Sequence, residues 1–390
     1  MITGDQVLIK QINKSLVMNI IREKRNISRA QISKITGLNR ATVSAIVDEL
    51  IYEGIVIEEG LGESKGGRKP IILRINENYA CIIGIDLGVN YVSVLLANFN
   101  AKTLWSKKLM LNIGESQEEI IDKIFTLVDE ALINAPKTIK GILGIGMGVP
   151  GITNHKEGII LKAPNLNWEN VNIKEIIGEK YDTKIFIDNE ANVAAIGEKW
   201  FGTGQKFKNL IYVSAGIGVG AGIIINDKLF RGANGLAGEL GHMTIDVNGM
   251  KCSCGNIGCW ELYASEKALI RLMSPQNDIN YSKNKKLIDI IEQARNGSIE
   301  AINSFKSVAK FLGLGIVNLI NTFDPELIII GNTISLAYDL IIDEVKRIVN
   351  DNCFTTKHSK VKIEVSRFGT DACAIGAIAL VISDIFSLSF

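Results

Sequence analysis

The sequence predicts an α/β protein with a small, separate domain at its N-terminus. Up to about residue 55, apolar residues recur at helical spacing, whereas from Cys81 onward short apolar runs ending in glycine alternate with helix-like stretches. The 390 residues are 47% hydrophobic, which is enough for two or three domains with cores of their own. Because no apolar run approaches the roughly 18 residues of a membrane span and no signal-peptide pattern is present, we expect a cytoplasmic protein without a membrane partner.

Three helices are expected in the N-terminal segment. The first places Ile20 and Ile21 on its apolar side. Ser28 is a good N-cap for the second helix, which stops at Gly37, and Asn39 is positioned to cap the third. A tight turn between the second and third helices predicts a helix-turn-helix motif.

A two-stranded wing is expected after this motif. Residues 55–57 and 71–75 read as strands, joined by the loop Ser-Lys-Gly-Gly-Arg-Lys-Pro at 64–70. Residues 1–46 carry eight Lys or Arg and two acidic residues, a net charge of +6, whereas the remainder carries −5. We therefore interpret residues 1–78 as a winged helix-turn-helix domain that binds double-stranded DNA.

The expected DNA contacts lie at the start of the third helix, which enters the major groove, and in the wing, which follows the minor groove. The predicted residues are Asn39, Arg40, Thr42, Ser44, Lys65, Arg68 and Lys69. The alternative interpretation is a three-helix protein-interaction module with a flexible basic loop.

The body of the chain reads as two related lobes. Apolar strands at 81–88, 142–151, 211–222 and 327–331 alternate with helical stretches near 116–133, 190–200, 264–273 and 306–322. The strand and glycine turn near Asp86 is echoed near Ser214, which indicates two lobes with a cleft between them. Glycines beside a cleft expose backbone N–H groups that suit phosphates or sugar hydroxyls.

A short window combines three thiols and an imidazole. The four residues are His242, Cys252, Cys254 and Cys259. Three Cys and one His fill a tetrahedral shell, so we predict a structural Zn²⁺ with no position for a catalytic water. Gly255 and Gly258 allow the tight turn that this requires. The alternative is a disulfide or inert thiols, which is how we interpret Cys81, Cys353 and Cys373.

These motifs resemble the ROK family of sugar kinases and sugar-responsive repressors. The most specific is Cys-x-Cys-Gly-x-x-Gly-Cys-x-Glu at 252–261, within a resemblance that covers 80–385. It implies a two-lobed, actin-like ATPase fold for 79–390, with lobe 1 at 79–190 plus the C-terminal helix 371–390, and lobe 2 at 191–370. The wing-bearing N-terminus resembles the repressor branch. Residues 39–54, the Gly-Gly-Arg-Lys-Pro wing and residues 86–91 resemble the xylose repressors of Gram-positive bacteria.

Four positions depart from the kinase pattern of this family. The first phosphate loop has Val89-Asn90 in place of Gly-Thr, and the second begins with Ser214 and Ala215 where kinases have Gly-Thr. The catalytic Asp is replaced by Glu190, and the adenosine-side Gly-Gly by Gly331-Asn332. Phosphoryl transfer depends on positioning, so we expect no catalytic residues and no enzyme activity.

The sugar-facing residues of the family are better preserved. By resemblance they are Asn165, Asn189, Glu190, Glu239, His242 and Glu261. Carboxylates accept hydrogen bonds and amides both donate and accept them, as a polyhydroxylated ring requires. Each could instead cap a helix or stabilise a loop. Because His242 also belongs to the zinc set, the metal would orient the pocket.

The leading hypothesis is a sugar-responsive repressor that binds a palindromic operator as a homodimer, or as a tetramer of paired dimers, and is released by a small sugar, with xylose favoured. The hinge between wing and body is expected at residues 76–80. The alternatives are an active ATP-dependent sugar kinase with an autoregulatory DNA-binding domain, a repressor that responds to glucose or N-acetylglucosamine, and a regulator that senses zinc itself.

Overall fold

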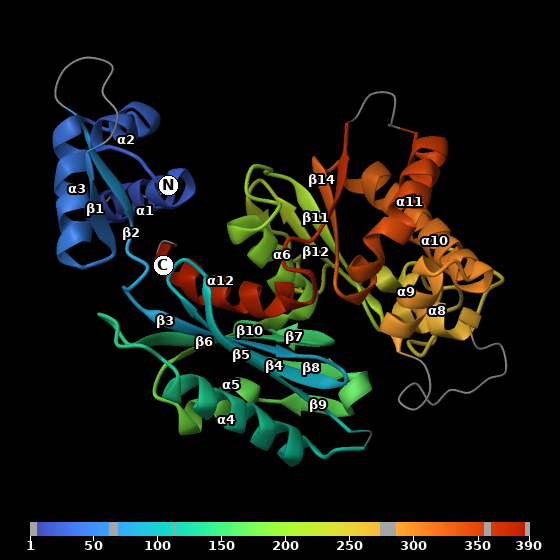
Figure 1. Ribbon diagram of the computed structural model, residues 1–390. Helices are drawn as coiled ribbons and strands as arrows, with labels where there is room; N and C mark the ends of the chain where they lie inside the picture. Colours follow the sequence, from blue (N-terminus) through green and yellow to red (C-terminus); the bar gives the residue numbers. More distant parts are fainter. Residues whose placement is uncertain (1–5, 62–68, 113, 274–285, 355–359, 387–390) are drawn as a thin grey trace.

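The protein has three parts, an N-terminal domain and two lobes, which Figure 1 shows in sequence colours. The computed structural model describes residues 6–61, 69–112, 114–273, 286–354 and 360–386. Each lobe is built around a five-stranded sheet. The predicted mixed α/β architecture is therefore confirmed.

The N-terminal domain contains three helices and a two-stranded antiparallel sheet. Its elements are α1 (Gln6–Lys24), α2 (Arg29–Thr36), α3 (Arg40–Tyr52), β1 (Val56–Leu61) and β2 (Ile71–Ile75). Ser28 caps α2 in a capping box with Gln31, and Gly37 ends the helix with a φ of 73°. Asn39 caps α3 by accepting the Thr42 N–H at 2.7 Å. The helix-turn-helix with its wing forms as the sequence predicts.

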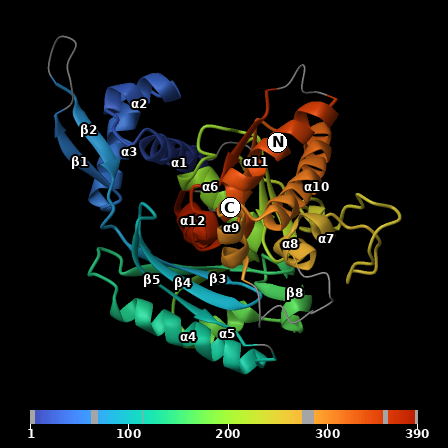
Figure 2. The same ribbon diagram turned by 45° about the vertical axis from the view of Figure 1, so that its right-hand side comes forward.

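Lobe 1 is built on a mixed sheet in the order β10-β6-β3-β4-β5. Its strands are β3 (Cys81–Leu87), β4 (Tyr91–Asn98), β5 (Thr103–Met110), β6 (Ile142–Val149) and β10 (Lys184–Asn189). Every residue of β3 is buried, as expected for a central strand covered on both faces. Figure 2 shows α4 (Gln117–Ile133) on one face of this sheet and α12 (Ala372–Phe386) on the other. A smaller sheet lies beside it, with β7 (Ile152–Asn154), β8 (Ile159–Ala163), β9 (Trp168–Val171), η1 (Pro164–Leu166) and α5 (Ile173–Lys180).

Lobe 2 repeats the plan of lobe 1. Its sheet has the order β13-β12-β11-β14-β15, with β11 (Leu210–Ala215), β12 (Val219–Ile225), β13 (Lys228–Leu229), β14 (Leu327–Gly331) and β15 (Lys362–Val365). In both lobes the first three strands form an antiparallel meander and the last two add in parallel. The structure therefore confirms the expectation of two lobes with related strand arrangements.

The remaining helices of lobe 2 lie on its outer side (Figure 1). They are α8 (Glu266–Met273), α9 (Leu287–Arg295), α10 (Ile299–Phe323) and α11 (Tyr338–Asn352). Four short helices complete the described elements: η2 (Leu240–His242), α7 (Glu261–Ala264), η3 (Thr333–Ala337) and η4 (Gly369–Asp371), the last of which directly precedes α12. Trp260 is fully buried among the helices of lobe 2 and donates its indole N–H to the Phe311 carbonyl at 2.8 Å. This contact fixes the loop that precedes α7 against the core of the lobe.

Two helices pack against each other between the sheets. α6 (Glu190–Phe201) contacts the sheet of lobe 2, and α12 contacts the sheet of lobe 1. The segment Gly369–Phe386 is long and apolar enough to cross a membrane, but 61% of it is buried inside the protein. Its composition is explained by its place in the core between a sheet and a helix.

The connection between wing and body is hydrogen-bonded to both. The Asn76 amide donates to the Gly54 carbonyl at 2.8 Å, and the Lys140 N–H donates to the Tyr79 carbonyl at 2.9 Å. The Tyr79 ring packs on Phe99 at 4.9 Å between centres. The expected hinge at 76–80 is therefore a packed segment in this conformation, and any rotation there must also move its partners.

Candidate functional site

The three predicted cysteines and the histidine form one compact cluster. Their ligand atoms all lie within 4.8 Å of one another. The Sγ atoms of Cys254 and Cys259 are 3.7 Å apart, as are the Cys252 Sγ and the His242 Nδ1. Ligands placed about 2.3 Å from a tetrahedral zinc are separated by about 3.8 Å, so the spacing and the donor set both fit this ion.

The loop geometry explains why this cluster forms locally. Gly255 and Gly258 have φ values of 96° and 69°, and a Cβ on Gly258 would collide with the Asp246 backbone. The turn between Cys254 and Cys259 therefore depends on these glycines. None of the described cysteines forms a disulfide, and Cys81, Cys353 and Cys373 are buried as expected.

A cavity open to solvent lies between the lobes. Three of the predicted sugar residues line it: Asn189, Glu190 and Glu239. The other lining residues are Gly151, Ile152, Thr153, Ala191, Asn192, Gly220, Ala221, Gly235, Leu236, Ala237 and Gly238. Lobe 1 supplies the residues around Gly151, and lobe 2 supplies the loop from Gly235 to Glu239.

The predicted residues Asn165, His242 and Glu261 do not line this cavity. Asn165 is exposed on η1, at the edge of lobe 1. Glu261 lies against the cysteine–histidine cluster, with its Oε1 at 3.2 Å from the Cys252 Sγ and 3.6 Å from the His242 Nδ1. The structure thus places Glu261 and His242 beside the cavity wall that Glu239 forms, rather than on its surface.

Asn189 has a structural role at the mouth of the cavity. Its Oδ1 accepts the N–H groups of Ala191 at 2.9 Å and Asn192 at 3.4 Å, which caps α6. Its Nδ2 donates to the Gly151 carbonyl at 2.9 Å. The Asn189 side chain, which the family resemblance assigns to sugar, therefore also links the start of α6 to the loop at Gly151.

Acidic side chains dominate the electrostatics of the cavity. Burial raises the pKa of Glu190, the nearby carboxylates of Asp86 and Glu239 add to the effect, and together they bring it to about 8. Burial also raises the pKa of Glu239, an effect that His242 opposes and Glu261 reinforces. With its raised pKa, Glu190 carries a proton near neutral pH, so its carboxyl can donate one hydrogen bond and accept others, which suits a neutral ligand with several hydroxyl groups.

An ion pair between Arg231 and Asp188 joins the two lobes. Arg231, in the loop after β13, places its Nη1 2.5 Å from the Oδ2 of Asp188, which precedes Asn189 on β10. The Oδ1 of Asp188 accepts the Asn189 N–H at 2.8 Å and the Asn192 amide at 3.3 Å. Sequence reasoning missed this pair because its partners come from different lobes.

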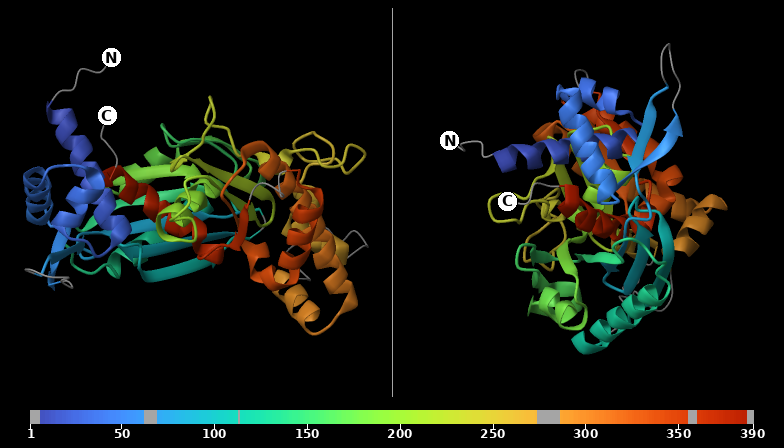
Figure 3. Two further views of the ribbon diagram at one scale, coloured as in Figure 1. Left: turned by 90° about the horizontal axis from the view of Figure 1, so that it is seen from above. Right: turned by 90° about the vertical axis from the view of Figure 1, so that its left-hand side faces the viewer.

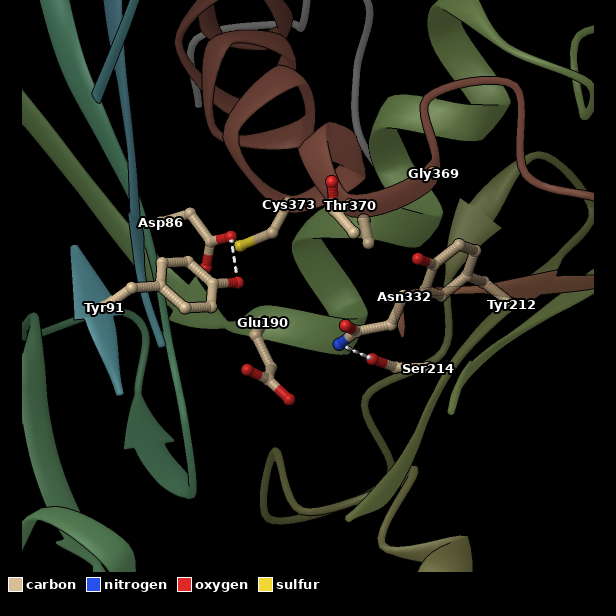
Figure 4. Close-up of a pocket in the computed structure, with 10 residues that line it drawn as sticks. Asp86, Tyr91, Glu190, Tyr212, Ser214, Asn332, Gly369, Thr370 and Cys373 are labelled. Carbon is tan, nitrogen blue, oxygen red and sulfur yellow. Dashed lines mark hydrogen bonds between the residues drawn. The ribbon is translucent and has the colours of Figure 1, made fainter. Parts of the chain in front are cut away.

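A second, smaller cavity lies where the altered phosphate loops meet (Figure 4). Asp86, Glu190, Tyr212 and Thr370 contribute polar groups to its wall. Burial raises the pKa of the Cys373 thiol well above its ordinary value, and the neighbouring Asp86 adds to the effect. Sequence reasoning treated Cys373 as an ordinary core residue, and nothing in its apolar helix signalled a cavity.

The predicted DNA-contacting residues share the N-terminal part of α3. Asn39 and Arg40 are exposed, whereas Thr42 and Ser44 are half-buried. Lys69 is exposed at the end of the wing, while Lys65 and Arg68 lie outside the described residues. These positions make Arg40 the accessible cation at the start of the helix.

An ion-pair network missed by sequence reasoning orients α3 and the wing. Arg29, at the start of α2, lies 2.8 Å from Asp48 on α3 and 2.7 Å from Glu58 on β1. Burial lowers the pKa of Arg29, but its two acidic partners together outweigh this effect and raise the pKa overall. One guanidinium therefore links α2, α3 and the wing.

The fold and these sites define a two-lobed scaffold of sugar-kinase type that carries a winged-helix domain. A family model described as ROK family matches residues 82–384, and one described as winged helix-turn-helix DNA-binding matches residues 12–57. The chain belongs to the ROK family.

Relatives and solved structures agree with this assignment. The xylose repressor of Caldicellulosiruptor bescii is 45% identical over 98% of each chain. The crystal structure of a ROK family transcriptional regulator, a homolog of the E. coli MLC protein, has a TM-score of 0.80 at 28% identity over 97% of each chain. A Streptomyces griseus ROK glucokinase in complex with glucose and AMPPNP has a TM-score of 0.68 at 29% identity, and covers 77% of this chain and 98% of its own.

Proposed function

We propose that this protein is a sugar-responsive transcriptional repressor whose operator affinity falls when a small sugar binds between the lobes. The observation that carries the proposal is the combination of a winged-helix domain with an interlobe cavity lined by hydrogen-bond acceptors, on a chain that matches a xylose repressor along 98% of its length. D-xylose is the favoured sugar on this ground. Its hydroxyl groups would form hydrogen bonds with Asn189, Glu190 and Glu239, which line the cavity. Asn165, His242 and Glu261, which do not line it in this conformation, belong to the proposed sugar set by family resemblance alone.

The DNA partner is proposed to be a palindromic operator bound by a homodimer. Two α3 helices spaced about 34 Å apart would meet successive major-groove faces. Asn39, Arg40, Thr42 and Ser44 would face the major groove, with Lys65, Arg68 and Lys69 of the wing along the minor groove. As a repressor, the protein would act in the cytoplasm.

The altered phosphate loops support a protein that does not transfer phosphate. The Tyr91 hydroxyl donates to Asp86 Oδ2 at 2.7 Å, and the Asn332 amide donates to the Ser214 hydroxyl at 3.0 Å. A Cβ on Gly216 would lie 2.8 Å from the Asn332 side chain, so this amide already crowds the second phosphate loop. With Glu190 also facing this cavity, a triphosphate would meet side chains and carboxylates instead of open backbone N–H groups.

We further propose that His242, Cys252, Cys254 and Cys259 hold a structural Zn²⁺. When bound, the ion supplies a fixed tetrahedral crosslink between η2 and the loop before α7. His242 is three residues after Glu239, and Glu261 directly follows Trp260, which anchors the loop in the core. The metal would therefore set the distance between the cluster and the wall of the sugar cavity.

One titration tests the proposal. Purified protein is bound to a labelled promoter fragment and titrated with D-xylose, D-glucose and N-acetylglucosamine, with fluorescence anisotropy as the readout. Release by xylose at the lowest concentration supports the proposal, and release by another sugar redirects it to that effector. DNA binding unaffected by every sugar, or steady production of sugar phosphate when ATP is added, would overturn it.

A further inference from the structure

A buried contact between one cation and two aromatic rings joins the DNA-binding domain to the body. Arg22, near the end of α1, holds its guanidinium 4.0 Å from the centre of the Trp200 ring on α6. Trp200 lies edge-on to Phe386 at 5.7 Å between ring centres. The Phe386 carbonyl accepts hydrogen bonds from the Ser15 hydroxyl at 2.5 Å and the Asn19 amide at 3.3 Å, both on α1.

The guanidinium of Arg22 is held in this contact and largely withdrawn from water. Its side chain is 17% exposed, and burial lowers its pKa. Its Nε has no hydrogen-bond partner among the described residues. A cation over an aromatic face is attracted more strongly when both are desolvated, so the body fixes the position of α1.

The other end of α6 lies at the sugar cavity. Asn189 caps the helix, and Glu190, its first residue, lines both cavities. Its 12 residues span about 18 Å, so this one helix connects the interlobe region with Trp200. The second cavity also contains Cys373, near the start of α12, whose last residue is Phe386.

α6 and α12 are packed too closely to move independently. A Cβ on Gly197 would lie 2.8 Å from the Gly376 Cα, and a Cβ on Gly376 would collide with the Val193 carbonyl. Their backbones are therefore in contact, and one helix cannot slide or rotate without carrying the other. Figures 1 and 3 both show α12 running from the region between the lobes to the side of α1.

The apolar packing continues through this junction. Buried side chains of α1, α3 and β2 form one continuous cluster with those of α12, from Val17 and Leu50 to Ile378 and Ile382. The DNA-binding domain thus rests on the end of the α6–α12 pair without a solvent-filled gap. A shift of that pair must either move α1 or break buried contacts.

We propose that α6 and α12 form a lever that couples the sugar cavity to the DNA-binding domain, and that Arg22 and Trp200 transmit its movement to α1. The inference rests on the proposed function and names the elements that carry its regulation. Sugar hydroxyls that bind Glu190 bias the position of α6 at one end, and α1 follows at the other because Trp200 holds Arg22. Arg22 and Trp200 are positioning residues that touch neither ligand.

Two substitutions and a matched control test the lever. Arg22→Met keeps an unbranched side chain but removes the cation, and Trp200→Leu removes the ring. Lys24→Met removes an exposed cation two residues farther along α1, so it matches the loss of charge without touching Trp200. Operator affinity is measured by anisotropy with and without a saturating amount of whichever panel sugar acts most strongly on the wild-type protein, after circular dichroism has checked the fold of each variant.

In the wild-type protein, sugar should change operator affinity by about 5- to 150-fold, the usual range for allosteric coupling. We expect Arg22→Met and Trp200→Leu to lose most of this change, although each variant should still bind sugar and operator. Because coupling is reciprocal, operator DNA should also stop weakening sugar binding in these variants. Lys24→Met should keep the full response. A general packing defect would instead lower the affinity for operator or sugar, but the ratio of the operator affinities measured without and with sugar would remain.

A full sugar response in both folded variants would overturn the lever and leave the proposed function intact. A wild-type protein that responds to no sugar would overturn both. Hydrogen exchange on the wild-type protein provides a second measurement that needs no variant. Sugar should change the protection of residues 14–24, 193–201 and 378–386, and unchanged protection in all three segments would count against the lever.

Discussion

The hydroxyl of Tyr91 donates a hydrogen bond to the buried carboxylate of Asp86 at 2.7 Å. The two residues flank the altered first phosphate loop, and Figure 4 shows both facing the cavity that contains Glu190. Asp86 is 2% exposed, and its other oxygen has no hydrogen-bond partner among the described residues. The Tyr91 phenol thus pairs with one oxygen of the Asp86 carboxylate, beside the loop that resembles the first phosphate-binding loop of the family's kinases.

Tyr91→Phe should lower the free energy of unfolding by about 1 to 3 kcal/mol, because it removes the phenol donor from a buried carboxylate oxygen of Asp86. Urea denaturation monitored by circular dichroism measures the change. Tyr52→Phe, at a side chain that is 93% exposed, is the control and should have no measurable effect. Equal stability of the two variants would show that the hydrogen bond contributes nothing.

Glu190 should make the protein less stable as pH rises. Its pKa is raised to about 8 in the folded protein, above the value of about 4.3 for an unperturbed glutamate, so between these values the folded state binds a proton that the unfolded state lacks. Its contribution is complete below the lower value and is lost as pH approaches 8. We expect Glu190→Gln to lose less stability than the wild-type protein between pH 5 and pH 8, measured by urea denaturation.

The matched control for this titration is Glu175→Gln, at an exposed position in the first turn of α5. It should reproduce the wild-type pH dependence. A Glu190→Gln profile that runs parallel to the wild-type profile would mean that Glu190 titrates normally.

Cys254→Ser should release the metal and lower the melting temperature, because it removes one of four ligands at a site that crosslinks two loops. Elemental analysis should find one zinc per wild-type chain and much less in the variant. Cys81→Ala, which removes a buried thiol outside the cluster, should retain the zinc despite its own packing loss. Full zinc content in Cys254→Ser would exclude this cysteine as a ligand.

Arg40→Ala should lower operator affinity by about 1 to 3 kcal/mol if its guanidinium reads a guanine edge. Competition with nonspecific DNA distinguishes a lost base contact, which affects the operator most, from a lost phosphate contact, which weakens both DNAs alike. Arg347→Ala, an exposed arginine on α11, is the control. Wild-type affinity in Arg40→Ala would remove this residue from the DNA-contacting surface.

Local features could be predicted from the sequence because their causes are local. The caps at Ser28 and Asn39 depend on a side chain reaching a backbone N–H two or three residues away, and the glycines at 255 and 258 depend on their own φ angles. The four cluster residues likewise lie within an 18-residue window of the chain. Helix boundaries, the wing strands and the candidate zinc set therefore follow from short-range chemistry.

The tertiary structure decided how distant segments meet. The packing of the two lobes brings Asp188 to Arg231 and places Cys373 beside Asp86. It also keeps Asn165 away from the interlobe cavity. The contact of Arg22 with Trp200 joins residues 178 positions apart, and no periodicity or motif encodes it. Such pairs depend on the packing of whole elements, in which many weak apolar contacts fix the geometry together. The sequence by itself determined which chemical groups the protein carries, whereas the fold decided which of them act on one another.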